Sequence, residues 1–310
     1  MRWALLLLLG VSACTAVETA QSATGSSGAS NASTTGSSTG STGSGALLHF
    51  GFTGDTRPDD CDDAQNYPTA VFQSICAGMV AQGVQFAVDT GDHLKVCKGD
   101  SKSDAAAAAD AQLAKYAGAA SAVGLRLYMT MGNHECRDNS ALCDLGDPVL
   151  STFMGYVNAA VTTETPYYAF DVGTPLGTAS FVVLADTAWD AAQRDWLEAA
   201  LGRADGSKYT FVLKHLPSDN TSDFSTNADE LAVLAQHRVT LLLDSHAHTY
   251  VHADGSREVT LGLGGAPLQK PDVDTYGFGT VAQQPDGSLQ VTIFDAPTDA
   301  PRDGFTLAPN

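Results

Sequence analysis

Five short apolar segments of this sequence each end in side chains that can bind a metal ion. The five groups are Gly54-Asp55-Thr56-Arg57, Gly91-Asp92-His93, Gly132-Asn133-His134-Glu135, Lys214-His215 and Ser245-His246-Ala247-His248. Their carboxylate, amide and imidazole groups offer oxygen and nitrogen but no thiolate, which suits Zn²⁺, Mn²⁺ or Fe. Two such ions about 3.5–4 Å apart can share a carboxylate and stabilise both oxygens of an in-line phosphoryl displacement. The groups therefore predict a two-metal centre for phosphoester chemistry.

The apolar segments before these groups have the length of β-strands. They cover residues 47–52, 84–88, 125–129, 209–213 and 239–243, and further strands are expected at 167–172, 180–184, 258–263, 276–283 and 288–294. Helices are expected at 68–82, 104–122, 148–160, 190–202 and 227–236. Because the carboxyl ends of strands gather at one edge of an α/β sheet, the candidate ligands should meet there. The pattern predicts one α/β domain over residues 47–295, with two packed sheets and outer helices, and a loose tail at 296–310.

Each group has a simpler interpretation when it is taken alone. Gly-Asp is a common turn, and His246 and His248 could be a surface pair. Their order along the chain, with each group placed after an apolar strand, favours a shared site over ordinary turn and core residues. His93 follows Asp92 directly and would point away from the site if the strand continued, so we do not expect it to be a ligand.

The chain resembles the calcineurin-like metallophosphoesterases, in particular secreted members like the purple acid phosphatases, over about residues 47–295. The resemblance is carried by Gly91-Asp92, Gly132-Asn133-His134-Glu135, His246-Ala247-His248 and a helix with Gln193, Trp196 and Leu197. It implies a four-layer α-β-β-α sandwich with two mixed β-sheets and a dinuclear centre at the sandwich edge.

The resemblance also implies a role for each candidate residue. The implied ligands are Asp55 and His248 for a first metal, Asn133, His215 and His246 for a second metal, and Asp92 for both. His134 would face the substrate, where it stabilises the transition state or protonates the leaving oxygen, and Glu135 would orient its imidazole. A metal-bound hydroxide would be the nucleophile.

The sequence departs from the family at the first metal. The usual Asp-x-His is Asp55-Thr56-Arg57 here, and Lys95 stands where purple acid phosphatases have a tyrosine. The first metal therefore has three candidate protein ligands, and we expect it to bind more weakly than the second. Arg57 has two open interpretations: a structural salt bridge with an acidic neighbour, or a guanidinium that holds a substrate phosphate oxygen.

The N-terminus has the pattern of an export signal. Residues 1–13 combine an early arginine with a leucine-rich segment that is too short to span a bilayer, and Val11-Ser12-Ala13-Cys14 resembles the lipobox of bacterial lipoproteins. An ordinary signal peptide with an incidental cysteine is the alternative. Residues 14–46 would then be a lipidated Cys14 and a Ser/Gly/Thr-rich tether, which predicts an exported, membrane-anchored protein in the periplasm or at the cell surface.

Export predicts an oxidising compartment and disulfide bonds. Cys136 and Cys143 lie in one loop, and Cys61 and Cys97 follow neighbouring predicted strands, so we pair them in that way. Cys76 lies on an apolar helical face and is expected to be a free, buried thiol.

The composition limits the partners. Thirty-five acidic residues against 16 Lys and Arg give a formal charge of −19, which argues against nucleic-acid binding by charge. The favoured function is hydrolysis of small phosphate mono- or diesters. The alternatives are a degenerate lipoprotein that binds metal or phosphate without turnover, and an adhesion or scaffold lipoprotein.

Overall fold

The structure of the chain is a computed structural model that describes residues 45–137, 143–144, 146–220, 228–296 and 298–309. The chain divides into two units, 1–35 and 36–310, and every described residue lies in the second. The predicted signal peptide, the lipidated Cys14 and all but the end of the tether lie outside the described residues. No described helix is both long enough and apolar enough to cross a membrane.

The first sheet is mixed and has the strand order β12-β11-β10-β1-β2-β3. Its strands are β1 (His49–Thr53), β2 (Phe86–Asp89), β3 (Leu127–Met129), β10 (Gly277–Gln283), β11 (Leu289–Asp295) and β12 (Ala300–Leu307). Strands β1, β2 and β3 run parallel to one another, and β10 joins β1 in the antiparallel direction. The carboxyl ends of β1, β2 and β3 therefore lie at the same edge.

The second sheet is also mixed and has the order β4-β5-β6-β7-β9-β8. Its strands are β4 (Tyr168–Thr174), β5 (Gly177–Val183), β6 (Tyr209–Leu213), β7 (Leu241–Asp244), β8 (Tyr250–Val251) and β9 (Glu258–Leu261). Strands β5, β6, β7 and β9 are parallel, while β4 and β8 close the two sides in the antiparallel direction.

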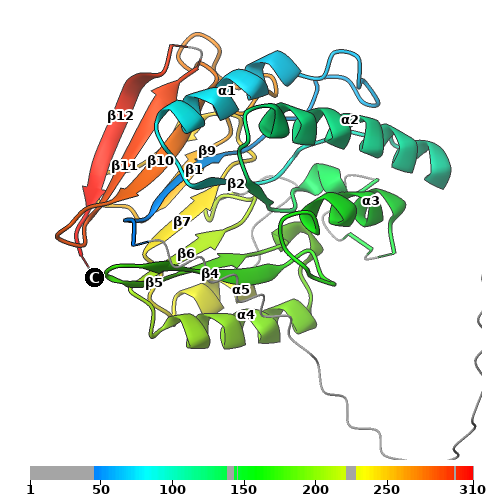
Figure 1. Cartoon of the computed structure of the whole chain (residues 1–310). Helices are drawn as coiled ribbons and strands as arrows, with labels where there is room; N and C mark the ends of the chain where they lie inside the picture. The colour runs from blue at the N-terminus through cyan, green and yellow to red at the C-terminus, as the bar shows by residue number, and fades with distance from the viewer. Residues whose placement is uncertain (1–44, 138–142, 145, 221–227, 297, 310) are drawn as a thin grey trace, which may run out of the picture. The chain divides into compact units, whose positions relative to one another are not determined.

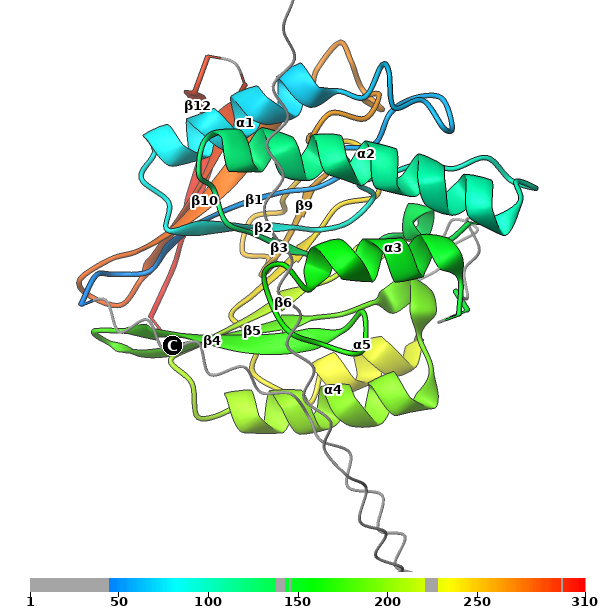
Figure 2. The ribbon, with the colours of Figure 1, turned by 45° about the vertical axis from the view of Figure 1, so that its right-hand side comes forward.

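Helices cover the outer face of each sheet, so the unit has the predicted four layers (Figure 1). The first sheet is covered by α1 (Thr69–Ala81) and α2 (Lys102–Ala122), and α3 (Pro148–Val157) packs against α2. The second sheet is covered by α4 (Ala191–Ala204), beside which lies α5 (Ala228–Leu234) (Figure 2). The α/β class, the mixed sheets and the order of elements are confirmed.

Aromatic side chains form the layer between the two sheets. The ring of Phe50 on β1 meets the rings of Phe181 on β5 and Phe211 on β6 edge-on, with centroids 5.1 and 5.0 Å apart. All three side chains are fully buried. Edge-to-face aromatic pairs are stabilising beyond the area they bury. This packing joins β1 of the first sheet to β5 and β6 of the second.

Several predicted boundaries were wrong: α3 and α5 end earlier than expected, the short strand β8 was not predicted, and two further differences concern the C-terminal segment and α4. Residues 300–307 are not a loose tail but strand β12, which pairs with β11 at the edge of the first sheet. Its side chains are mostly exposed, so the sequence has no apolar signal there. Helix α4 also continues past Gly202 to Ala204, since that glycine occupies an ordinary helical position instead of a C-terminal cap.

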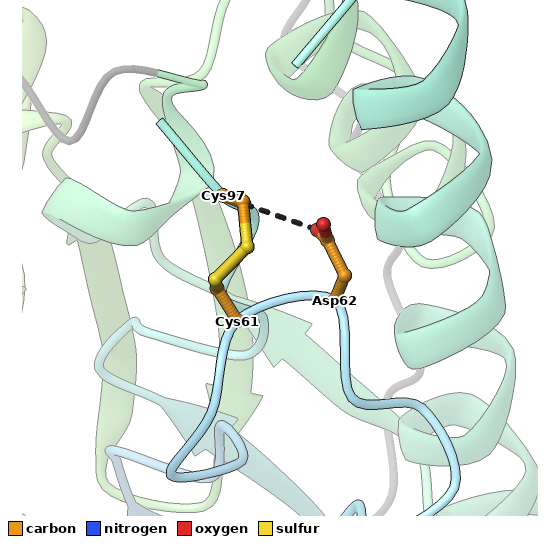
Figure 3. A group of neighbouring side chains, drawn as sticks. All are labelled: Cys61, Asp62 and Cys97. Atoms are coloured by element: carbon orange, nitrogen blue, oxygen red, sulfur yellow. Dashed lines mark hydrogen bonds between the residues drawn. A yellow bond between two sulfur atoms is a disulfide. The ribbon is translucent and has the colours of Figure 1, made fainter. Parts of the chain in front are cut away.

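The predicted cysteine pairing is confirmed. Disulfides join Cys61 to Cys97 and Cys136 to Cys143, and Cys76 is a buried free thiol. Figure 3 shows Cys61 and Cys97 beside Asp62, whose Oδ1 accepts the Cys97 N–H at 3.0 Å. The disulfide joins the loop after β1 to the loop after β2.

Candidate metal centre

The candidate ligands meet at the edge where strands of both sheets end. The loops after β1, β2, β3, β6 and β7 carry, in this order, Asp55, Asp92, Asn133 with His134, His215, and His246 with His248. Ligand atoms within 4.8 Å of one another form two groups there: Asp92, His215 and His246, and Asp55, Asp92 and His248. We call the first group, together with Asn133, the His215 half, and the second group the Asp55 half. Asp92 belongs to both, as predicted for a bridging ligand.

In the His215 half, four potential ligands surround one point. His215 Nε2 lies 3.0 Å from Asn133 Oδ1, 3.4 Å from Asp92 Oδ1 and 3.1 Å from His246 Nδ1. His215 Nδ1 donates to the carbonyl oxygen of Thr90 at 2.9 Å, which leaves the Nε2 lone pair directed toward the other ligands. This oxygen and nitrogen set fits one divalent transition metal.

In the Asp55 half, a buried carboxylate lacks the donors that its burial requires. Asp55 is fully buried, and neither of its oxygens accepts a hydrogen bond within the part of the chain that the structure describes. His248 Nε2 lies 3.4 Å from Asp55 Oδ1, and His248 Nδ1 donates to the Pro267 carbonyl at 2.8 Å. An orphaned buried carboxylate beside an oriented imidazole fits a second cation.

The backbone at four candidate ligands is held in the left-handed region. The φ angles are 60° at Asp55, 59° at Asp92, 60° at His246 and 46° at His248. Non-glycine residues seldom adopt this conformation, and it persists where the surrounding structure determines it. The four ligands therefore turn sharply out of their strands and point their side chains into one volume.

Glycines allow the loops to approach this closely. A Cβ atom on Gly132 would collide with the Oδ1 atom and backbone nitrogen of Asp92, and one on Gly91 would lie 2.7 Å from His215 Nδ1. On the loop after β9, a Cβ on Gly262 would collide with Asp55 Oδ2. The glycines before Asp92 and Asn133 are thus explained by close packing, and Gly262 is a residue that the sequence reading missed.

Arg57 lies at the Asp55 half. Its Nε is 3.5 Å from Asp92 Oδ2, and its Nη2 is 3.4 Å from His248 Nε2. A cation thus contacts two of the three ligands of this half. Together with His215 and His134, Arg57 holds the pKa of the buried Asp92 carboxyl well below its usual range, although burial alone would raise that pKa.

His134 lies beside Asp92, the carboxylate that belongs to both ligand groups. Its Nε2 is 3.7 Å from Asp92 Oδ2, and its backbone N–H donates to Asp92 Oδ1 at 3.0 Å. Burial lowers the pKa of His134 to about 4, and Arg57 adds to this effect while Asp92 opposes it. The imidazole is therefore neutral at pH 7.

Glu135 does not orient His134, which corrects the expectation from the family. Its carboxylate accepts backbone N–H groups of Gly132 at 2.6 Å, Asp92 at 3.1 Å and His93 at 2.8 Å. His93 Nδ1 is a fourth contact, 3.2 Å from Glu135 Oε1. Burial opposes a charge on His93, but Asp89 and Glu135 raise its pKa to about 10. His93 is not a member of either ligand group among the described residues.

Gln193 supports His215 through the loop after β5. As expected at a helix start, Asp190 accepts the Gln193 N–H at 2.7 Å, but the Gln193 side chain binds the N–H and carbonyl of Ala185 instead of completing a capping box. That loop presents Asp186, whose Oδ2 accepts the His215 N–H at 3.2 Å. Asp186 follows an apolar strand exactly as the ligands do, a signal that sequence reasoning could have used.

The chain belongs to the calcineurin-like phosphoesterase family, whose model matches residues 48–250. Two solved structures share its fold. A dimetal phosphatase from Danio rerio is 15% identical with a TM-score of 0.59, over 85% of this chain and 99% of that one. A purple acid phosphatase from seeds of yellow lupin (Lupinus luteus) is 15% identical with a TM-score of 0.61, over 85% of this chain and 54% of that one. No curated protein sequence matches the chain.

These findings identify the protein as a metallophosphoesterase, an enzyme that hydrolyses phosphoesters with the help of divalent metals. The chain covers about half of the lupin enzyme and nearly all of the fish enzyme. At 15% identity, both likenesses show the fold, and the ligand assignment rests on the geometry described above.

Proposed function

We propose that the protein hydrolyses small phosphate mono- or diesters outside the cytoplasm with two unequal divalent metals, the more tightly bound one in the His215 half. The observation that carries this proposal is the convergence of five strand-end loops on Asp92, with ligand atoms on both sides of its carboxylate. When bound, the metals would polarise the phosphoryl group and activate a water molecule for attack. Zn²⁺, Mn²⁺ and Fe all suit this ligand set.

The position of Arg57 at the metal centre favours a phosphate-binding role for its guanidinium over a purely structural role. Its side chain reaches the ligands of the Asp55 half, with Nε 3.5 Å from Asp92 Oδ2 and Nη2 3.4 Å from His248 Nε2. A guanidinium donor that is left over at a metal centre can bind a phosphate oxygen. In the resting enzyme the same charge offsets part of the negative charge of the Asp92 carboxylate.

His134 can assist the leaving group once substrate is bound. A neutral imidazole is a poor acid, but an anionic phosphate beside it would raise its pKa toward the working pH. Its backbone hydrogen bond to Asp92 holds the side chain next to the bridging carboxylate. The ring is therefore placed to hydrogen-bond the phosphoryl oxygens and to donate a proton to the leaving oxygen.

Hydrolysis of an aryl phosphate and of the matching aryl diester, each with Mn²⁺ or Zn²⁺ added to the apo protein, tests this function. We expect turnover of at least one substrate and its loss on chelation. The competing function is a degenerate protein that binds metal or phosphate without turnover, favoured by the missing fourth ligand in the Asp55 half. Tight metal binding without hydrolysis of either phosphoester would support the degenerate, non-catalytic protein.

Membrane anchoring through Cys14 is a separate part of the proposal. It is supported by the lipobox-like sequence before Cys14 and by the Ser/Gly/Thr-rich segment after it. Replacement of Cys14 by alanine should move the protein from the membrane fraction to the soluble fraction in a bacterial host. An unchanged membrane fraction would contradict lipidation at this residue.

A further inference from the structure

His93 is a fully buried residue to which the metal chemistry gives no role. Its Nδ1 lies 3.2 Å from Glu135 Oε1, and its Nε2 lies 3.0 Å from Asp89 Oδ1. The ring of Tyr116 packs edge-on against it, with centroids 4.7 Å apart, and the ring of Phe153 lies at 5.5 Å. The imidazole is thus enclosed between two carboxylates and two aromatic rings.

Both of these carboxylates hold backbone of the loops that carry ligands. Glu135 accepts the N–H groups of Gly132 and Asp92, which belong to the loops after β3 and β2. Asp89 accepts the Gly91 N–H at 3.1 Å and the Tyr116 hydroxyl at 3.0 Å. The Glu135 contacts therefore tie the loop with Asn133 and His134 to the loop with the bridging carboxylate.

We propose that His93 is a positioning residue, which holds Asp89 and Glu135 in place so that Asp92 and Asn133 face the same metal. This inference rests on the proposed function, since it concerns the same centre. Both ring nitrogens of His93 lie within 3.2 Å of a carboxylate oxygen, so the imidazole sets the spacing of Asp89 and Glu135, although the Nε2 contact does not have the alignment of a hydrogen bond. Its removal would open a space between the two buried carboxylates, which would then shift toward water or new partners.

The geometry of Asp92 explains why the effect should reach the metal. Asp92 has a φ of 59°, a conformation that its neighbours must maintain. Its N–H is held by Glu135, and its carbonyl accepts the N–H groups of Thr56 and Arg57 at 3.0 Å. If Glu135 shifts, the bridging carboxylate is the first ligand to move.

The test compares His93→Gln, Glu135→Gln and the double variant in titration calorimetry of the apo protein with Mn²⁺. We expect each single change to lower the Mn²⁺ affinity of the tighter site about 10- to 100-fold, as is typical for groups that orient ligands. The double variant should bind Mn²⁺ no more weakly than the single variant with the lower affinity, because both changes break the same contact between His93 and Glu135. The value of kcat should fall while KM changes little.

Leu113→Ala is the matched control, since Leu113 is a buried residue of α2 with no contact to either carboxylate among those the structure records. It should lower the unfolding temperature and leave the Mn²⁺ affinity unchanged. If His93→Gln behaves like this control, His93 only stabilises the fold and the inference is wrong. If His93→Gln does not fold, an unchanged affinity in Glu135→Gln overturns the inference in the same way. A wild type that binds Mn²⁺ but hydrolyses no phosphoester would defeat the proposed function alone, because the calorimetric comparison still applies.

Discussion

The two halves of the metal centre share Asp92 but differ in what surrounds the shared carboxylate. The His215 half has one carboxylate, one amide and two imidazoles, and these imidazoles lie close enough to bind one ion together. The Asp55 half has two carboxylates and one imidazole, with the Arg57 guanidinium against two of these groups. By charge alone the Asp55 half would be the stronger cation site, but Arg57 offsets one of its negative charges.

The comparison indicates that the charge around each half, and not only its number of ligands, sets the expected order of metal affinity. Neither Asp55 oxygen accepts a hydrogen bond from the described chain, which favours a bound cation in this half. The Arg57 guanidinium already supplies one positive charge there. Repulsion between Arg57 and an incoming dication is reduced when an anionic phosphate lies between them. Metal binding in the Asp55 half should therefore depend on phosphate, whereas binding in the His215 half should not.

The largest effect is expected from Asp92→Asn, because it removes the charge that both halves share. Its activity should fall by several orders of magnitude, and both metals should bind more weakly. Elemental analysis after gel filtration, with steady-state kinetics, checks both expectations. Near-normal hydrolysis with both metals retained would show that the two halves do not meet at Asp92.

His134→Gln should separate catalysis from metal binding. We expect a loss of roughly 10²–10⁴-fold in kcat, the usual contribution of a general acid. Metal content should stay at the wild-type level in both halves, since the His134 side chain lies 3.7 Å from Asp92 Oδ2 and belongs to neither ligand group. Marked metal loss in this variant would make His134 a ligand and would end its assignment to the substrate side.

The pair His246→Ala and His248→Ala compares the two halves directly. His246→Ala should remove the tight site, because its Nδ1 and His215 Nε2 are 3.1 Å apart and bind the same ion. His248→Ala should keep one tight site and lose only the weaker, phosphate-dependent one. Mn²⁺ titrations with and without inorganic phosphate distinguish these results. Equal losses in the two variants would mean that the halves are not independent.

The sequence predicted that the candidate ligands would lie together because the rule that places them is local. Asp55, Asp92, Asn133, His215 and His246 each follow an apolar strand, and the parallel order of the strands brings those ends to one edge. The disulfide between Cys61 and Cys97 was predictable in the same way, from loops that follow neighbouring strands, and the one between Cys136 and Cys143 from their place in a single loop.

The supporting contacts could not be predicted from the sequence. The contact of His93 with Glu135 joins residues that are 42 positions apart in the sequence. Gly262 lies in the loop after β9, more than 200 residues after Asp55, and packs against the Asp55 carboxylate. Strand β12 was missed for a different reason, since an exposed edge strand has no apolar pattern. The Glu135 prediction failed because the family motif indicates that the residue matters but not which group it contacts.

Arg57→His should make the two halves more alike. The new imidazole would add a ligand and remove the cation, so Mn²⁺ should bind the Asp55 half more tightly, and without phosphate. Loss of the guanidinium should raise KM several-fold, because a phosphate contact is lost. Arg57→Lys is the control: it keeps the charge, so metal binding should remain weak, but it lacks the planar fork and should also raise KM. Two equally tight Mn²⁺ sites in the wild type would contradict this role and would support the structural interpretation of Arg57.

The smallest effect on activity, and the finest test of the comparison, is expected from the disulfide between Cys61 and Cys97. It ties the loop of Asp55 and Arg57 to the loop after β2, and Asp62 reinforces the tie through its contacts with Lys95 and Cys97. The double variant Cys61→Ser/Cys97→Ser should therefore weaken the Asp55 half and raise KM by a small factor, while the His215 half keeps its affinity.

Removal of the other disulfide, Cys136 to Cys143, is the matched control. The two bonds span 36 and 7 residues, so the loop-entropy model assigns about 4 kcal/mol of stability to the first and about 2 kcal/mol to the second. Denaturant unfolding measures these losses, and Mn²⁺ titration of the folded proteins measures the effect on the centre. If both variants lose stability but neither changes the Mn²⁺ affinity of the folded protein, the first disulfide acts only on the unfolded chain. A change confined to the Asp55 half in Cys61→Ser/Cys97→Ser would instead show that the disulfide helps to keep the two halves unequal, because it fixes the loop that carries Arg57.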